Sequence, residues 1–148
     1  MGLKVLGLLS AVVASGSLVN ARAPTDETDG LIKNLDLTTF PNSVGPRRMQ
    51  GKTTLADYGF VEVEKTVRGA NFVRDDQGWM MGFTIILAGP KVLRVCFYDK
   101  GLKKPGDALA PSYNSTTALL VSKKPLGRWT AKQVPAGFLK CRNDPATA

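Results

Sequence analysis

The clearest alternation of apolar and polar residues lies in the middle of the chain. Every second residue from Trp79 to Leu87 is apolar, and the segment from Val92 to Tyr98 alternates in the same way. A period of two is typical of β-strands, because successive side chains point to opposite faces of a sheet. The intervening Ala88-Gly89-Pro90 is typical of a turn. The pattern therefore predicts a central antiparallel hairpin.

Weaker patterns on either side of this hairpin predict further strands. Residues 61–67 alternate valine with polar side chains, which indicates a half-buried strand. Residues 75–78 (DDQG) form a hairpin signal that joins residues 71–74 to the central hairpin. Short apolar runs at 116–121 and 128–134 predict two more strands. Together these segments predict an antiparallel sheet of about five strands.

A short helix is expected immediately before the first of these strands. Thr53 or Thr54 can cap its N-terminus, and Gly59 can end it after Tyr58. One short helix with about five antiparallel strands predicts an α+β fold. A small all-β sandwich or barrel is the alternative.

The first 21 residues differ in character from the rest of the chain. Lys4 precedes an apolar run from Val5 to Ala14, and small residues at Val19 and Ala21 are typical of a cleavage site. The run is shorter than the ~20 residues that a spanning helix needs. We therefore predict that residues 1–21 are a cleaved export signal. A cut after Ala23 and an uncleaved anchor are the alternatives.

The remaining chain divides into two parts. Residues 22–50 are polar at first and then rich in turn residues, so we expect an N-terminal segment and loop whose first residues are disordered. Residues 51–148 are expected to form a single globular domain. No transmembrane segment is predicted in the mature chain, because no second apolar run approaches spanning length.

Cys96 and Cys141 are the two cysteines of the chain. In an exported protein an even number of cysteines predicts a disulfide. This bond would close a ring whose entropic contribution is roughly 4 kcal/mol in the chain-entropy model. Alternation places Cys96 on the face of its strand that is opposite the apolar face. If Cys141 is bonded to Cys96, the C-terminal segment that contains Phe138 and Leu139 should cross this second face of the sheet. The chain has no histidine, and no metal site or cofactor is predicted.

Positive charge is concentrated in the second half of the chain. The formal net charge is +8 at pH 7, and residues 91–148 contain Asp99, Asp107 and Asp144 as their acidic residues. Such a basic half favours an anionic partner such as lipid head groups, lipopolysaccharide or an acidic glycan, or it serves as a solubilising surface. The residues of the candidate anion-binding surface are Arg47, Arg48, Lys52, Lys100, Lys103, Lys104, Lys123, Lys124 and Arg128.

The segment from Gly45 to Thr53 resembles a phosphate-binding loop only in part. Five residues separate its glycines where the nucleotide-binding motif has four, and Pro46 lacks an amide that could contact phosphate. Nucleotide binding is therefore not expected. Arg47, Arg48 and Lys52 beside a helix N-terminus could still hold a phosphate or sulfate.

Catalysis is not expected. Histidine is absent, and no nucleophile motif of the G-x-S-x-G type occurs. The carboxylate pairs Glu62/Glu64, which would share one strand face, and Asp75/Asp76 are interpreted as structural. The sequence thus favours a small exported binding or accessory module, periplasmic or secreted. A small secreted hydrolase or enzyme inhibitor is the alternative.

Overall fold

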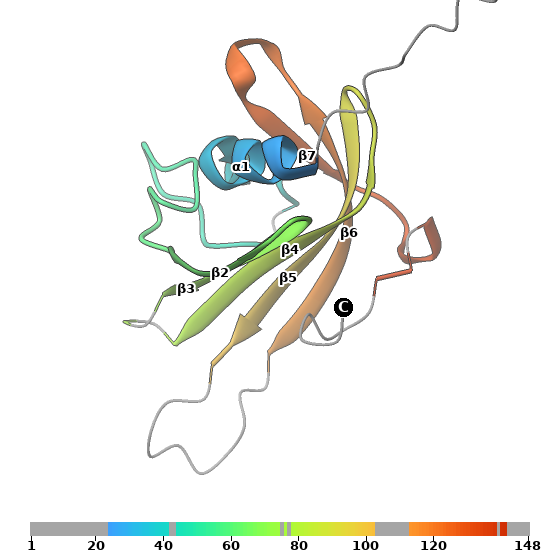
Figure 1. Ribbon diagram of the computed structural model, residues 1–148. Coiled ribbons are helices and arrows are strands. Elements are labelled where there is room, and N and C mark those ends of the chain that lie inside the picture. The colour runs from blue at the N-terminus through green and yellow to red at the C-terminus, as the bar shows by residue number, and fades with distance from the viewer. Residues whose placement is uncertain are drawn as a thin grey trace, which may run out of the picture.

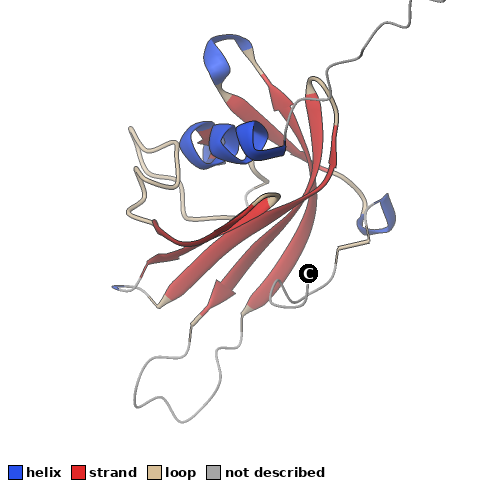
Figure 2. Cartoon of the chain, viewed as in Figure 1, coloured by secondary structure: helices blue, strands red, loops and turns tan. Residues whose placement is uncertain are grey.

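A single strongly curved sheet forms most of the molecule, and one short helix lies against its concave side (Figures 1 and 2). This computed structural model describes residues 24–41, 44–74, 76, 78–102, 113–138 and 140–141. The sheet is a half-barrel whose strand order is β1-β7-β6-β5-β4-β3-β2. All neighbouring strands are antiparallel except β1 and β7, which are parallel.

The helix and strands have the following bounds. The N-terminal unit contains the helix α1 (Pro24–Asn34), the short strand β1 (Leu35–Asp36) and the 3-10 helix η1 (Leu37–Thr39). The other strands are β2 (Val61–Thr66), β3 (Gly69–Arg74), β4 (Trp79–Ala88), β5 (Val92–Gly101), β6 (Asn114–Lys123) and β7 (Trp129–Gln133). Two further 3-10 helices, η3 (Pro125–Gly127) and η4 (Ala136–Phe138), lie on either side of β7.

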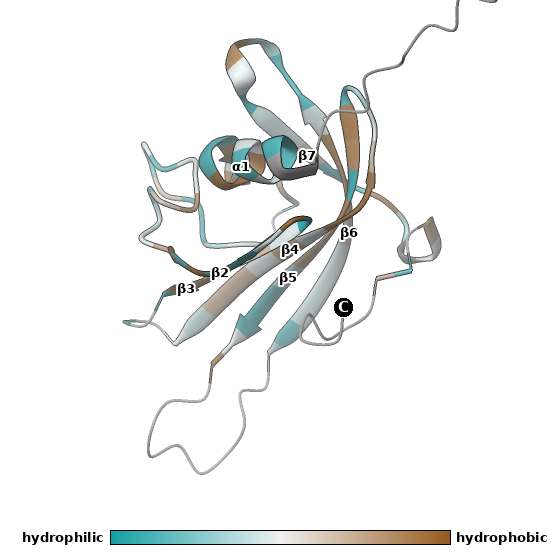
Figure 3. Cartoon of the chain, viewed as in Figure 1, coloured by the Kyte–Doolittle hydropathy of each residue, from teal (hydrophilic) through white to brown (hydrophobic). Residues whose placement is uncertain are grey.

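The core lies on the concave face of the sheet. The predicted central hairpin is present as β4 and β5, and Phe83 is the register partner of Phe97. The apolar faces that alternation predicts contribute Met81, Phe83 and Ile85 of β4 and Leu93, Val95 and Phe97 of β5 to the core. Leu87, which follows a register shift after Ile85, is instead 53% exposed. Helix α1 contributes Leu31, and the following loop contributes Phe40, whose ring meets that of Phe97 edge-on at 4.8 Å between centroids. Hydropathy mapped on the ribbon shows apolar segments along these strands (Figure 3).

The expected α+β fold with five antiparallel strands is wrong. The sheet has seven strands and is mixed, because β1 pairs in parallel with β7. It is one open half-barrel and not a sandwich or a closed barrel. The helix also lies elsewhere: residues 24–34, which belong to the segment expected to be a polar tail and loop with disordered first residues, form α1. This helix has little apolar surface, so its packing on β7 through Leu31 and Trp129 overrides the weak local preference.

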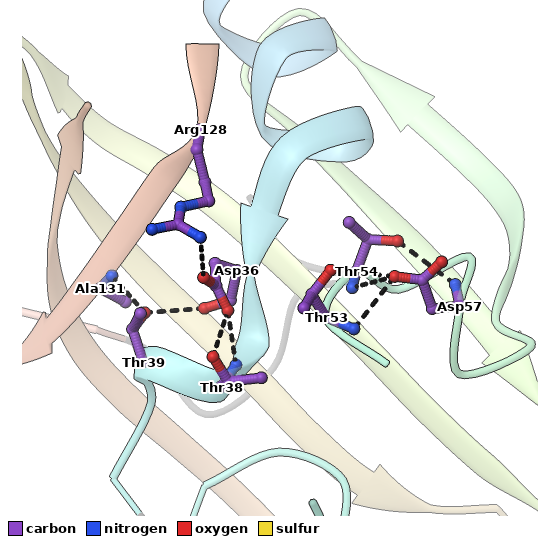
Figure 4. Close-up of polar contacts among 8 residues, drawn as sticks. All are labelled: Asp36, Thr38, Thr39, Thr53, Thr54, Asp57, Arg128 and Ala131. Carbon is purple, nitrogen blue, oxygen red and sulfur yellow. Dashed lines mark hydrogen bonds and ion pairs between the residues drawn. The ribbon is translucent and has the colours of Figure 1, made fainter. Parts of the chain in front are cut away.

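The expected helix near residues 53–58 is a single turn. The Asp57 carboxylate accepts hydrogen bonds from the amides of Thr53 and Thr54 at 3.0 and 2.8 Å (Figure 4). The Thr54 hydroxyl accepts one from the amide of Asp57 at 3.3 Å. Gly59 then adopts a φ of +82°, which ends the turn. The capping residues are therefore where the sequence placed them, but only three residues lie between Thr54 and Tyr58.

Strand β2 exists but is not half-buried, because all of its residues are exposed. Its ladder to β3 shifts register between Glu62 and Glu64. Glu62 is opposite Phe72, and Glu64 is opposite Asn71. Because adjacent residues of β3 point to opposite faces, the two glutamates lie on opposite faces, contrary to the expectation from simple alternation.

The predicted disulfide between Cys96 and Cys141 is confirmed, with 5.6 Å between the Cα atoms. Cys96 is fully buried on the face of β5 that is opposite the core. The ring of Phe138 lies over the Arg94 guanidinium at 4.8 Å, and Arg94 belongs to the same face. The C-terminal segment therefore crosses this face, although Phe138 remains 48% exposed. Leu139 lies outside the described residues.

None of the helices in the described part of the chain is long and apolar enough to span a membrane. The predicted signal segment, residues 1–21, lies outside the described residues.

Candidate functional site

A groove lies at the end of the half-barrel where β3 ends and β4 begins. Residues 45–50 line it together with Tyr58, Phe60, Arg74 and Trp79, and its volume is about 840 Å³. We call it the mouth groove. It is open to solvent, and its walls combine three arginines with three aromatic rings. This composition suits a ligand that has both anionic groups and a flat or apolar part.

The three arginines are held in different ways. Arg48 donates from Nη2 to the carbonyl oxygen of Phe40 at 2.8 Å, so this guanidinium also supports the loop. Arg74 donates from Nε and Nη2 to the Asp76 carboxylate at 3.1 and 3.2 Å. Arg47 is exposed and has no hydrogen-bond or ion-pair partner among the described residues. Of the three, Arg47 is therefore the most available to an anionic ligand.

Tyr58 links the floor of the mouth groove to the segment above it. Its ring is buried, and its hydroxyl accepts a hydrogen bond from the amide of Met49 at 3.2 Å. The Lys52 ammonium lies 5.9 Å from the centroid of the same ring. The structure thus brings Arg47, Arg48 and Lys52 to one region. They lie beside a turn and not beside the helix N-terminus that the sequence suggested.

Asp99 joins the opposite walls of the mouth groove. Its Oδ1 accepts from the Trp79 indole at 2.6 Å, and its Oδ2 accepts from the amide of Gly45 at 3.0 Å and the Tyr113 hydroxyl at 3.4 Å. The rings of Trp79 and Tyr113 stack with 5.1 Å between centroids. The side chain is only 2% exposed. This burial raises the pKa of Asp99, although the three hydrogen bonds oppose the shift.

Sequence reasoning missed Asp99 as a site residue. The available signal was the alternation of β5, in which an aspartate follows Leu93, Val95 and Phe97 on the core face. A carboxylate at such a position needs donors around it, because burying an unpaired charge is costly. The donors come from residues far apart in the sequence, so their identity could not be read locally.

The remaining basic residues fall into separate regions. Lys100 is paired with Asn114 at one end of the β5–β6 ladder, whereas Lys123, Lys124 and Arg128 lie around the turn at the other end. Eight residues of strand separate these ends, which corresponds to about 26 Å. Lys103 and Lys104 lie outside the described residues. The structure therefore does not gather the described lysines of the C-terminal half into one patch.

Arg128 is partly neutralised by a buried carboxylate. Its Nη1 lies 3.5 Å from Oδ2 of Asp36, a residue that is only 3% exposed (Figure 4). Asp36 also accepts from the amide of Thr38 at 3.0 Å, which starts η1. Thr39 donates to the Asp36 carbonyl and accepts from the amide of Ala131 at 2.8 Å. These contacts hold β1 against β7.

The carboxylate pairs do not form a cleft. Glu62 and Glu64 are exposed on opposite faces of β2, and Glu64 accepts from the Asn71 amide at 2.8 Å. Asp76 pairs with Arg74, and Asp75 lies outside the described residues. Within the described segments, no three carboxylate or thiol groups come together in a way that could hold a metal ion.

Compared with protein-family models, with curated proteins and with solved structures, the chain matches none. The arrangement of residues in the structure is therefore the basis for a functional proposal.

Proposed function

We propose that the chain is a non-catalytic binding module that holds an acidic glycan in the mouth groove. The observation that carries this proposal is that Arg47, which has no partner among the residues that the structure describes, lines the same groove as Arg48 and Trp79. Guanidinium groups donate paired hydrogen bonds to sulfate or carboxylate, and aromatic faces pack against sugar rings. The groove volume of about 840 Å³ is sufficient for a short oligosaccharide.

The hydrogen bonding of Asp99 favours binding over hydrolysis. A glycosidase needs two carboxyl groups on either side of the scissile bond. Asp99 is the buried carboxylate nearest the mouth groove walls, and its two oxygens already accept from three donors. This arrangement supports a structural role for Asp99. We therefore favour the binding module over the secreted hydrolase, the alternative suggested by the sequence.

The binding proposal is tested by titrating a sulfated heparin oligosaccharide into the protein and measuring binding by isothermal titration calorimetry. A neutral dextran oligosaccharide of the same length is the ligand control. We expect affinity for the sulfated ligand to fall steeply between about 0.05 M and about 0.3 M salt. Arg47→Glu should weaken binding by about tenfold or more.

The matched control variant is Lys132→Glu, which makes the same charge change at an exposed position on β7. Equal loss of affinity in both variants would show that only net charge matters and would contradict a site in the mouth groove. Equal affinity for the sulfated and neutral ligands would contradict the glycan proposal itself.

We further propose that the protein is exported to the periplasm or the cell exterior, with removal of residues 1–21. The apolar leader pattern and the Cys96–Cys141 disulfide support this location. Mass spectrometry of the exported protein should find an N-terminus at Arg22 or Pro24. Recovery of a chain that still begins at Met1 from the membrane fraction would contradict the proposal.

A further inference from the structure

An apolar side chain is held in solvent at the turn between β6 and β7. Leu126 is 105% exposed, so no described residue covers it. It has a φ of +65°, and among the described residues it is the one non-glycine residue in the left-handed region. That conformation is unfavourable for leucine. Pro125 and Gly127 are adjacent and shape the turn. The turn therefore exposes Leu126 without any benefit to the core.

A second turn, between β4 and β5, lies at the same end of the sheet (Figure 1). The amide of Lys123 donates to the carbonyl oxygen of Lys91 at 3.1 Å, which joins the two turns. Leu87 and Val92, which border the β4–β5 turn, are 53% and 41% exposed. Exposed apolar residues thus occur in the β6–β7 turn and at the strand ends beside the β4–β5 turn.

The same end is uniformly basic. Lys91 lies in the β4–β5 turn, and Lys123, Lys124 and Arg128 flank the β6–β7 turn that carries Leu126. The Lys123 ammonium lies 5.4 Å from the centroid of the Trp129 ring. The sequence contains no acidic residue between Asp76 and Asp99 or between Asp107 and Asp144, and these intervals include both turns. Among the described residues, the buried carboxylate of Asp36 lies 3.5 Å from the Arg128 guanidinium. The three lysines are left without a carboxylate partner among the described residues.

We propose that this end of the sheet, which we call the basic tip, docks on an anionic phospholipid bilayer. The basic tip consists of Lys91, Lys123, Lys124, Leu126 and Arg128. Lysines beside an apolar side chain match the interface of a bilayer, where phosphates lie next to acyl chains. A soluble polyanion would account for the lysines but not for the fully exposed Leu126. The basic tip is separate from the mouth groove, so the two proposals are independent.

The geometry predicts a weak and reversible attachment. Each cation near an anionic surface contributes about a fivefold gain in partitioning. Insertion of one leucine side chain adds about a further tenfold. Attachment should therefore depend on both the lipid charge and Leu126, and it should be reversed by salt.

The test is co-sedimentation with vesicles of two compositions: phosphatidylcholine alone, and equal parts of phosphatidylcholine and phosphatidylglycerol. The protein is purified from an oxidising compartment, and its N-terminus is established first, because an attached leader would itself enter lipid. We expect binding to the anionic vesicles only. Lys123→Glu combined with Lys124→Glu should reduce partitioning by more than about twentyfold.

Leu126→Gly tests insertion and relieves the unfavourable φ, so this variant should fold. It should reduce partitioning by about tenfold. Control variants are Val61→Ser, an apolar residue of the exposed β2 edge that is 66% exposed, and Lys100→Glu at the opposite end of β5. Both controls should bind as the unaltered protein does. In Leu126→Trp, the added indole emission should shift to shorter wavelength when anionic vesicles are present.

Equal binding to both vesicle types, or binding to neither, would overturn the proposal. Loss of binding in the lysine variant but not in Leu126→Gly would show recognition of phosphate groups without insertion, and would also overturn it. Arg47→Glu should leave vesicle binding unchanged. A loss in that variant would assign lipid binding to the mouth groove and not to the basic tip.

Discussion

Replacement of Asp99 by alanine tests the internal organisation of the mouth groove most directly. The substitution removes one buried carboxylate and with it the shared acceptor of the Gly45 amide, the Trp79 indole and the Tyr113 hydroxyl. We expect the segment that begins at Gly45 to separate from β5. The stacked pair of Trp79 and Tyr113 should also become more mobile.

The magnitude follows from three lost hydrogen bonds and one removed charge. A hydrogen bond to a charged group contributes about 1.5–3 kcal/mol, and a buried donor left unpaired costs about 1–3 kcal/mol. Trp79 and Tyr113 are partly exposed, so water can replace part of what they lose. Removing the buried carboxylate relieves its desolvation cost. We therefore expect Asp99→Ala to lower the free energy of unfolding by about 2–3 kcal/mol.

The Asp99→Asn variant tests whether the contribution of Asp99 to stability rises or falls as the pH is lowered. Burial raises the pKa of Asp99 in the folded protein, so the folded state holds this proton to a higher pH than the unfolded state does. The contribution of Asp99 to stability is therefore greatest below its unfolded pKa of about 3.9. It is lost as the pH rises through the folded pKa. Asparagine does not titrate, so the stability deficit of Asp99→Asn should grow as the pH is lowered through this window.

Urea unfolding followed by tryptophan fluorescence and by circular dichroism measures these changes. The comparison is made at neutral pH and at about pH 4, near the unfolded pKa. Asp76→Ala is the control, because it removes an exposed aspartate that pairs with Arg74 at the surface. Unaltered stability in Asp99→Ala, or a deficit in Asp99→Asn that shrinks on acidification, would refute the account of this carboxylate.

Three further outcomes are expected. Reduction of the Cys96–Cys141 bond should lower the free energy of unfolding by roughly 2–4 kcal/mol, and two free thiols in protein from an oxidising compartment would contradict the bond. Gly30→Ala would place a Cβ 2.9 Å from Nε1 of the buried Trp129. The overpacking cost of about 1–3 kcal/mol should exceed the helix-propensity gain of about 1 kcal/mol, so a stabilised variant would refute this packing. Asp57 should titrate with a pKa of about 2 in carboxyl NMR, because backbone amides donate to it, and an ordinary value would contradict the capped turn.

Local periodicity predicted the strands from β2 to β7 but not the N-terminal edge of the sheet or its helix. Strands β4 to β7 were predicted because their alternate residues face one core. Helix α1 was missed because its sequence, PTDETDGLIKN, is polar and contains a glycine, and its stability comes from contact with β7. The two-residue strand β1 is too short to give more than a weak local signal.

Sequence reasoning selected some of the residues that line the candidate site, but on the basis of a helix that is not present. Arg47, Arg48 and Lys52 were selected because they preceded an expected helix, and that helix is a single turn. They nevertheless lie together, because the loop that contains them folds over the end of the sheet. Asp99 could not be found in this way, since its three donors come from three separate segments. Its role depends on tertiary contacts that sequence spacing does not describe.

The parallel pairing of β1 with β7 has a consequence for the order of folding. The hydrogen bond from the Ala131 amide to Thr39 joins residues that are 92 positions apart in the sequence. The antiparallel hairpins of β3 to β6 need much shorter loops, and short loops close at lower entropic cost. We expect these hairpins to form first and α1 to dock only after β7 is in place. Until then the concave face around Phe83 and Phe97 is uncovered, and this is the surface that a chaperone would contact.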